Sequence, residues 1–189
     1  GDGIIVRGID PEMEGRTSNV ISDIKAGKYE FKDVVLDDDT IPGMVIGATL
    51  AERLGVYVGE SVVLYSLTGE DIHSRARPRV AKFYISGLFE TGLYEFDVQM
   101  AYISLPAAQK LFKTGDAATA VHLKLDDIFM AETMAPQIDS LLEFRYDVVP
   151  WNVLHQNLFG WIAFEKLILF LGFILIVLVA AFSIISTLV

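Results

Sequence analysis

The chain has 189 residues and carries 15 Lys and Arg against 25 Asp and Glu. The resulting net charge of −10 argues against nucleic-acid binding, which needs a basic surface, and does not favour attraction to anionic lipid. The absence of cysteine gives no information about the redox compartment. All of the charge lies within residues 1–166, a length that suffices for one domain with a core or for two small domains.

The last 23 residues, 167–189, are uncharged and almost entirely apolar. A helix of this length is ~34 Å long at ~1.5 Å per residue, which is enough to cross a hydrocarbon core of ~30 Å. We therefore predict one transmembrane helix, the alternative being a buried helix of a soluble protein. Because the chain starts at Gly1 without an initiator Met and stops with the apolar run, we expect an internal piece of a longer protein.

In the first part of the chain, apolar periodicity predicts short strands that alternate with short helices. The adjacent carboxylates Asp37, Asp38 and Asp39 indicate a solvated loop, since the spaced acidic pattern of calcium loops is absent. The expected elements are a strand over residues 4–9, a helix over 17–28, a helix over 47–54 that Gly55 ends, and a strand over 61–66.

A polar interruption over residues 67–79 precedes the second part, in which β-branched and aromatic residues predict further strands. Residues 120–149 predict a βαβ unit, and the mixture of strands and short helices predicts the α+β class. The expected elements are strands over 80–89, 98–104, 121–125 and 146–149, with helices over 105–113 and over 129–144, where Pro136 kinks or restarts the helix.

Residues 151–166 place apolar side chains at helical spacing and include two tryptophans and two phenylalanines. Aromatic rings immediately before a span are typical of a membrane interface. We expect a single helix from about residue 152 through residue 189. This helix either carries motion between an external domain and the membrane or serves as a plain interfacial anchor.

Motifs for catalysis or metal binding are missing from the sequence. His73, His122 and His155 lie far apart, without cysteine partners and without an H-E-x-x-H motif. Neither a G-x-S-x-G elbow nor a G-x-x-x-x-G-K-[ST] phosphate loop occurs. We therefore expect a chain that is not an enzyme and holds no cofactor or metal, so that a partner must bind any ATP that drives its function.

An ordered set of motifs resembles one family of membrane proteins. The motifs are R-G-I-D-P at residues 7–11, L-G-V-x-V-G at 54–59, G-L-F-E-T-G-L-Y-E-F-D at 87–97, A-Y-I-S-L at 101–105, and the aromatic segment before the span. Together they resemble the permease subunits of the bacterial lipoprotein-releasing ABC transporter, the LolC/LolE type of the FtsX/MacB-like permease superfamily. The resemblance covers nearly the whole chain.

The resemblance implies a two-lobed, MacB-like periplasmic domain, followed by a stalk and one transmembrane helix. Its two lobes would be a porter-type βαβ lobe and a β-rich lobe inserted into it. The implied boundaries are 1–35 for the end of the first part of the porter-type lobe, 36–112 for the inserted β-rich lobe, 113–150 for the second βαβ part, 151–166 for the amphipathic stalk helix, and 167–189 for the transmembrane helix.

By the same resemblance, the protein is expected to extract lipoproteins from the outer leaflet of the bacterial inner membrane and to pass them to a periplasmic carrier. Its soluble domain would lie in the periplasm. The implied partners are a cytoplasmic ABC ATPase that holds ATP and magnesium, a second permease subunit in a homo- or heterodimer, the lipoprotein, the periplasmic lipoprotein carrier, and the lipid bilayer.

Two groups of candidate site residues accompany this resemblance. The polar segment over residues 67–79 stands at the place where, in one subunit type of the family, a hairpin docks the carrier. Here the segment is rich in Arg and carries a single proline, so an ordinary solvated hairpin is the alternative. Its candidates are Leu67, Ile72, Arg75, Arg77, Pro78 and Arg79. Candidates for contact with lipoprotein acyl chains are Leu158, Phe159, Ile162 and Phe164.

Three other functions compete with lipoprotein release. The first is a MacB-like permease that drives efflux by mechanotransmission through a periplasmic adaptor. The second is an FtsX-like signalling permease that moves no substrate and activates cell-wall hydrolases. The third is a membrane-anchored domain with only a structural role.

Overall fold

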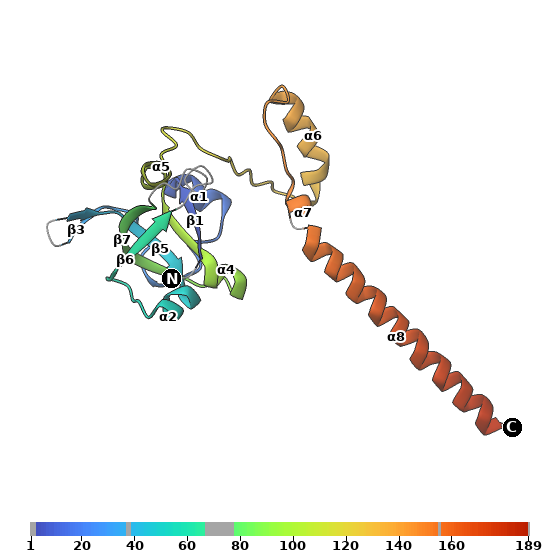
Figure 1. The fold of residues 1–189 in the computed structure, drawn as a ribbon. Helices are drawn as coiled ribbons and strands as arrows, with labels where there is room; N and C mark the ends of the chain where they lie inside the picture. The colour runs from blue at the N-terminus through green and yellow to red at the C-terminus, as the bar shows by residue number, and fades with distance from the viewer. Residues whose placement is uncertain (1–2, 37–38, 67–77, 155, 189) are drawn as a thin grey trace. The chain divides into compact units, whose positions relative to one another are not determined.

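The computed structural model describes residues 3–36, 39–66, 78–154 and 156–188 (Figure 1). The chain divides into two units, Gly1–Lys124 and Leu125–Val189. The first unit mixes strands and helices, and the second contains only helices and irregular segments within the described residues. The predicted α+β class is therefore confirmed. Of the acidic run, Asp37 and Asp38 lie outside the described residues, and Asp39 opens strand β4 (Asp39–Ile41).

The first unit is built on a six-stranded sheet in which β7 (Arg79–Phe89) is the central strand. The described strands follow the order β1-β8-β5-β7-β2, and β6 also pairs with β7. One edge of β7 binds β6 along its first half and β2 along its last residues, and the other edge binds β5. The remaining strands are β1 (Ile5–Ile9), β2 (Ile24–Gly27), β5 (Gly43–Gly47), β6 (Ser61–Ser66) and β8 (Met100–Ser104).

Both faces of this sheet are buried, because β5 and β8 alternate their side chains between two apolar clusters. Met44 and Ile46 belong to the first cluster, and Val45 belongs to the second. The first cluster also contains Leu50 and Ala51 of α2 (Ala48–Leu54) and Ala108 and Leu111 of α5 (Leu105–Phe112). The second cluster contains Ile9, Val20, Phe31, Phe89, Met100 and Tyr102.

A register shift between β5 and β7 explains how β7 serves both clusters. Met44 pairs with Ile85, whereas Val45 pairs with Gly87, so Ser86 is the extra residue. An extra residue exchanges the faces of the residues that follow it. Phe83 and Ile85 therefore enter the first cluster, and Phe89 enters the second. The hydroxyl of Ser86 donates a hydrogen bond to the carbonyl oxygen of Met44 at 3.0 Å.

Local sequence explains where the helices of this unit begin and end. Helix α1 (Pro11–Thr17) starts after Asp10, whose carboxylate accepts hydrogen bonds from the amides of Glu12 and Met13. Helix α5 starts after Ser104 in the same way. Helix α2 ends at Gly55, whose φ of 67° lies in the left-handed region that glycine adopts without strain.

Most elements predicted for the first unit are confirmed, but the helix predicted over residues 17–28 is wrong. Asp10 caps a helix that begins at Pro11, earlier in the chain than predicted, and this helix ends at Thr17. Residues 24–27 instead form β2, which hydrogen-bonds to the end of β7. Four further elements were not predicted: β3 (Val34–Leu36) and β4, which pair as a hairpin, β5, and α4 (Tyr94–Gln99), which occupies the start of the strand predicted over 98–104.

The second unit contains the short 3₁₀ helix η1 (Ile128–Met130), α6 (Ala131–Leu141), α7 (Trp151–Leu154) and α8 (Gln156–Leu188). Pro136 lies inside α6. The strands predicted over 121–125 and 146–149 are not formed, so this structure has no βαβ unit there. Val121, Leu123 and Tyr146 are largely exposed, which shows that no other strand covers them. A strand without a partner leaves its backbone groups unpaired and is not stable alone.

The close approach of α4 to the end of β5 generates a stability prediction at Gly47. A Cβ atom at this position would lie 2.1 Å from the carbonyl oxygen of Asp97, and backbone cannot rotate away as a side chain can. We expect Gly47→Ala to destabilise the protein by about 1–3 kcal/mol, as overpacking does. Thermal unfolding of the purified full-length protein in detergent measures the effect.

The matched control for this prediction is Gly3→Ala, since a Cβ atom at Gly3 would meet nothing within 4 Å. This control is expected to shift the stability by no more than ~0.5 kcal/mol. Equal unfolding midpoints for the two variants would contradict the close approach of α4 to Gly47.

Candidate functional site

Strands β6 and β7 form the arm that carries the predicted carrier-docking hairpin. They pair antiparallel from Ser61 opposite Tyr84 to Ser66 opposite Arg79. The strands on both sides of the polar interruption are thus confirmed. Of the six candidate residues, Leu67, Ile72, Arg75 and Arg77 lie outside the described residues, and the structure places only Pro78 and Arg79.

Arg79 has a role within the fold that the sequence did not indicate. Its guanidinium donates a hydrogen bond to the carbonyl oxygen of Phe112 at 2.7 Å. Phe112 is the last residue of α5, where carbonyl groups lack helical partners and the helix dipole favours a positive charge. The end of the arm from which the hairpin segment continues is therefore held against α5 through this arginine.

The arm also presents an apolar outer face. Val62 and Leu64 pack against the first core cluster, so the alternating residues Val63 and Tyr65 point away from it. Tyr65 is 71% exposed and stands directly opposite Val80, which is also exposed. An aromatic residue and a β-branched residue in this arrangement stabilise a strand pair and offer contact area to a partner.

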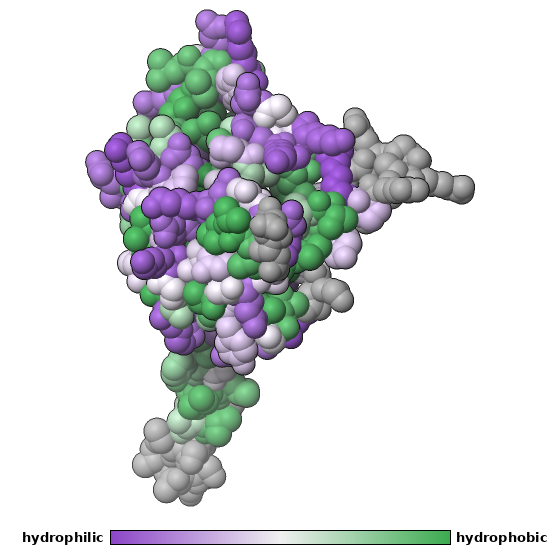
Figure 2. Space-filling model, turned by 90° about the vertical axis from the view of Figure 1, so that its left-hand side faces the viewer, coloured by the Kyte–Doolittle hydropathy of each residue, from purple (hydrophilic) through white to green (hydrophobic). Residues whose placement is uncertain are grey.

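Helix α8 matches the predicted membrane span. An 18-residue window, Phe164–Ala181, has a mean hydropathy of 2.5, and none of it is buried within the protein. Among the described residues it is the one helix that is long and apolar enough to cross a membrane. Where α8 is in view in Figure 2, most of its surface is green, the colour of hydrophobic residues.

The residues proposed to contact acyl chains lie at the start of α8. Phe164 is exposed, and its ring makes an edge contact with Trp161 at a centroid distance of 6.3 Å. The side chains of Leu158, Phe159 and Ile162 lie outside the described residues, although their backbone belongs to α8. The structure therefore gives one exposed aromatic pair where the apolar span begins.

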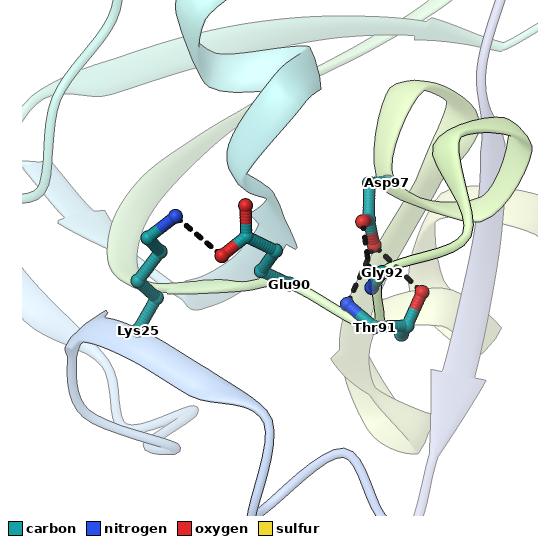
Figure 3. Close-up of polar contacts among 5 residues, drawn as sticks. All are labelled: Lys25, Glu90, Thr91, Gly92 and Asp97. Atoms are coloured by element: carbon teal, nitrogen blue, oxygen red, sulfur yellow. Dashed lines mark hydrogen bonds and ion pairs between the residues drawn. The ribbon is translucent and has the colours of Figure 1, made fainter.

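A second cluster of interest was not predicted: a turn over residues 91–97 that Asp97 closes (Figure 3). The carboxylate of Asp97 accepts hydrogen bonds from the Thr91 amide at 2.8 Å, the Thr91 hydroxyl at 2.8 Å and the Gly92 amide at 3.2 Å. Asp97 is only 3% exposed. These bonds fix the turn, and two side chains within it, Leu93 and Tyr94, are exposed.

Next to this turn, Lys25 of β2 forms an ion pair with Glu90 (Figure 3). The hydrogen bond to Glu90 raises the pKa of Lys25 above its ordinary value. Both side chains are well exposed, so the pair contributes little to stability. The sequence alone could not indicate this ion pair, because its two residues are separated by 65 positions.

A cleft in the second unit was likewise not predicted. It has a volume of ≈ 440 Å³ and is lined by Ile128, Phe129, Glu132, Trp151 and Asn152. The indole N–H of Trp151 donates to the carbonyl oxygen of Ile128 at 3.0 Å, and the Asn152 amide donates to the Glu132 carboxylate. The cleft thus joins η1 and α6 to α7.

The described residues bring no three His, Asp or Glu side chains together in a way that could hold a metal ion. Of the histidines, His122 follows the sheet in an exposed irregular segment, whereas His73 and His155 lie outside the described residues.

The buried Asp97 generates the next stability prediction. Asp97→Ala leaves the amides of Thr91 and Gly92 without their acceptor, and we expect a loss of about 2–4 kcal/mol. Glu95→Ala, an exposed position on the same helix, is the control and should change stability by less than ~0.5 kcal/mol. Chemical denaturation of the full-length protein in detergent tests this. Comparable losses in both variants would contradict a structural role for the carboxylate.

No protein-family model matches the chain, but curated proteins do. It is 31% identical over 186 residues to the "Lipoprotein-releasing system transmembrane protein LolC" of Xylella fastidiosa, which covers 97% of this chain and 43% of that protein. It is 31% identical over 195 residues to LolC of Neisseria meningitidis, which covers 99% and 44%. LolE of Haemophilus influenzae is 26% identical over 196 residues, covering 97% and 43%.

The chain spans less than half the length of these relatives. The match nevertheless runs through the sheet, the arm and the apolar helix alike, because it includes nearly every residue of the chain. The resemblance predicted from the sequence is confirmed: along almost its whole length, this chain is homologous to the LolC and LolE lipoprotein-releasing system transmembrane proteins.

Proposed function

We propose that this chain is part of the membrane subunit of an ABC transporter that extracts lipoproteins from the outer leaflet of the inner membrane and delivers them to a periplasmic carrier. ATP hydrolysis occurs in a separate cytoplasmic subunit, and a second permease subunit completes the membrane part. The first unit and the segment before α8 lie in the periplasm, and α8 crosses the inner membrane.

The observation that carries this proposal is the 31% identity to proteins named for lipoprotein release, over 97–99% of the chain. The exposed apolar helix agrees with a transmembrane subunit. The β6–β7 arm agrees with a carrier-docking role, because it presents Tyr65 and Val80 beside the predicted hairpin. Efflux and signalling permeases of the same superfamily remain the competing functions, and the test below separates them.

The proposal includes the two-lobed architecture, in which residues 113–150 complete a βαβ lobe with strands from elsewhere in the longer protein. The support is the alternating apolar pattern at Val121, Leu123 and Leu125, which predicts a strand with one buried face. Val121 and Leu123 are 82% and 63% exposed here, and α6 has no buried residue. Apolar surface of this extent is normally covered in a soluble lobe.

The lobe generates a prediction for the full-length protein. If residue 123 is buried by a partner strand, Leu123→Ala costs about 2–4 kcal/mol, although the side chain is exposed in the chain described here. His122→Ala, on the opposite face of the same strand, should cost less than ~0.5 kcal/mol. Thermal unfolding of both full-length variants in detergent measures this, and equal midpoints would mean that no strand covers Leu123.

Acyl-chain binding at the start of α8 explains how a lipoprotein could leave the membrane. Exposing an acyl chain to water costs ~0.8 kcal/mol for each CH₂ group, so extraction needs an apolar receiving surface. Trp161 and Phe164 supply exposed aromatic surface at the point where the apolar span begins. The candidates Leu158, Phe159 and Ile162 are proposed to extend that surface.

The test is ATP-dependent release of a triacylated lipoprotein from liposomes that contain the full-length protein and its co-purifying ATPase. We expect soluble lipoprotein only when both ATP and a periplasmic extract are present. Phe164→Asp should lower release at least ~10-fold, because a charge at the apolar surface opposes acyl-chain contact. Phe164→Leu keeps the surface apolar and should stay within about twofold, with correct insertion of both variants verified by protease protection.

Two other outcomes of this experiment would contradict parts of the proposal. Active ATP hydrolysis without any lipoprotein release would favour the efflux or signalling branch of the superfamily. Normal release by the double variant Arg75→Glu/Arg77→Glu, with the extract at limiting concentration, would show that the hairpin does not dock the carrier.

A further inference from the structure

We propose that the turn over residues 91–97 docks a positively charged polypeptide segment of a partner protein. Three large apolar side chains of this turn, Leu93, Tyr94 and Phe96, are exposed, Leu93 and Tyr94 by 60% and 68%. Apolar side chains that gather at one exposed place, with polar neighbours, are typical of interaction sites. The transport function proposed above gives these residues no role, and the inference does not rest on it.

At three of its six positions, helix α4 reverses the pattern that stability alone favours. A surface helix normally buries apolar side chains and exposes polar ones. In α4, Tyr94 and Phe96 are exposed, whereas the acidic residue Asp97 is almost fully buried. Burying a carboxylate costs free energy even when it is hydrogen-bonded. This exchange of positions therefore serves something other than the core.

Hydrogen bonds within the turn hold its backbone in one shape (Figure 3). The buried carboxylate of Asp97 accepts from the amides of Thr91 and Gly92. The amide of Leu93 donates to the hydroxyl of Thr91 at 3.2 Å. The carbonyl oxygen of Leu93 accepts from the amides of Phe96 and Asp97, at 3.0 Å in each case. Because a surface that is ordered in advance loses less entropy on binding, this turn presents its apolar side chains in a form suited to docking.

The charge of the turn determines the sign of the partner. Residues 90–97 contain three Asp and Glu and no Lys or Arg. Lys25, which lies beside the turn, is already paired with Glu90. The charges of Glu52 and Asp97 act on Lys25 as well, and they also raise its pKa. Such an acidic surface attracts a segment that carries Lys or Arg and repels an acidic one.

The same charge argues against two other occupants. An anionic lipid surface is repelled by these carboxylates. A second copy of this chain would bring the same acidic turn and a net charge of −10 to the contact, and like charges oppose such an association. A polypeptide segment with basic residues on both sides of aliphatic ones matches the apolar centre and the acidic surroundings together.

The experiment uses the full-length protein in phosphatidylcholine nanodiscs, labelled with 3-fluorotyrosine and observed by ¹⁹F NMR. The resonance of Tyr94 is the one that disappears in Tyr94→Phe. The probe is the peptide acetyl-Lys-Leu-Leu-Lys-amide, and the control is acetyl-Glu-Leu-Leu-Glu-amide, which has the same apolar centre and the opposite charge. We expect the basic peptide to shift this resonance with saturation in the ~1–10 mM range, a weak affinity that suits so short a segment. The acidic peptide should leave it unchanged.

Charge variants test whether the acidic residues of the turn attract the peptide. Glu95→Gln should raise the dissociation constant of the basic peptide at least ~3-fold, since it removes a charge beside the apolar side chains. Glu12→Gln, an exposed carboxylate on α1, should change it less than ~1.5-fold. Raising the NaCl concentration from about 0.05 M to about 0.5 M should weaken binding at least ~3-fold, because salt screens the attraction.

Apolar variants test the contact itself. Leu93→Ser should raise the dissociation constant of the basic peptide at least ~5-fold, because it removes apolar surface that the peptide covers. Met13→Ser, which removes an exposed apolar side chain from α1, should change it less than ~1.5-fold. Both variants retain Tyr94, so the same resonance reports the binding.

Several results would overturn the proposal. Equal shifts with the two peptides would show a merely apolar surface, and equal effects of the two glutamine variants would show unspecific attraction by an acidic protein. A Tyr94 resonance that responds to phosphatidylglycerol in the nanodisc, but not to the basic peptide, would assign the turn to a lipid surface. A shift that depends on protein concentration without peptide would assign it to a second copy.

Two further results would remove the site altogether. A Tyr94 resonance that a dissolved gadolinium chelate does not broaden would show that the rest of the full-length protein covers the turn. Absence of any shift with the basic peptide up to about 20 mM would leave no affinity to explain. None of these outcomes depends on lipoprotein release, so failure here is distinct from failure of the transport proposal.

Discussion

The first unit depends on the pairing of β7 with three other strands. β6 and β2 share one edge of β7 in succession, and β5 occupies the other edge. The register shift at Ser86 lets this single strand supply Phe83 and Ile85 to one core cluster and Phe89 to the other. The arm that begins as β6 and β7 is therefore continuous with the buried centre of the sheet. A load on the arm is carried by the same backbone hydrogen bonds that order the core.

The sequence predicted those elements whose residues carry their own signal. The strand over residues 61–66, the helix ended by Gly55 and the apolar span follow from β-branched runs, a left-handed glycine and length. The helix predicted over residues 17–28 failed because Val20 and Ile24 have helical spacing in the sequence, yet they serve the second cluster and the pairing of β2 with β7. Tertiary pairing outweighed local periodicity there. The Asp97 turn and the cleft arise from contacts that no local pattern reveals.

The two units differ in how much of their apolar surface is buried. In the first, large residues such as Phe83, Met44 and Leu50 are almost fully buried, and the sheet is closed on both faces. In the second, Phe129, Leu141 and Phe144 are largely exposed, and α8 is apolar around its whole circumference over residues 167–181. A helix that is apolar all round suits lipid rather than water. The exposed side chains near α6 have mixed polarity instead, which suits coverage by protein.

The hydrogen bonds at the base of the stalk bear on whether α8 only anchors or also transmits motion. Trp151 and Asn152, on consecutive positions of α7, bind Ile128 and Glu132, which belong to η1 and α6. A plain interfacial anchor requires no such bonds, because aromatic side chains alone hold a helix at the interface. Bonds from α7 to two neighbouring elements resist relative displacement, so a movement of α7 also moves η1 and α6.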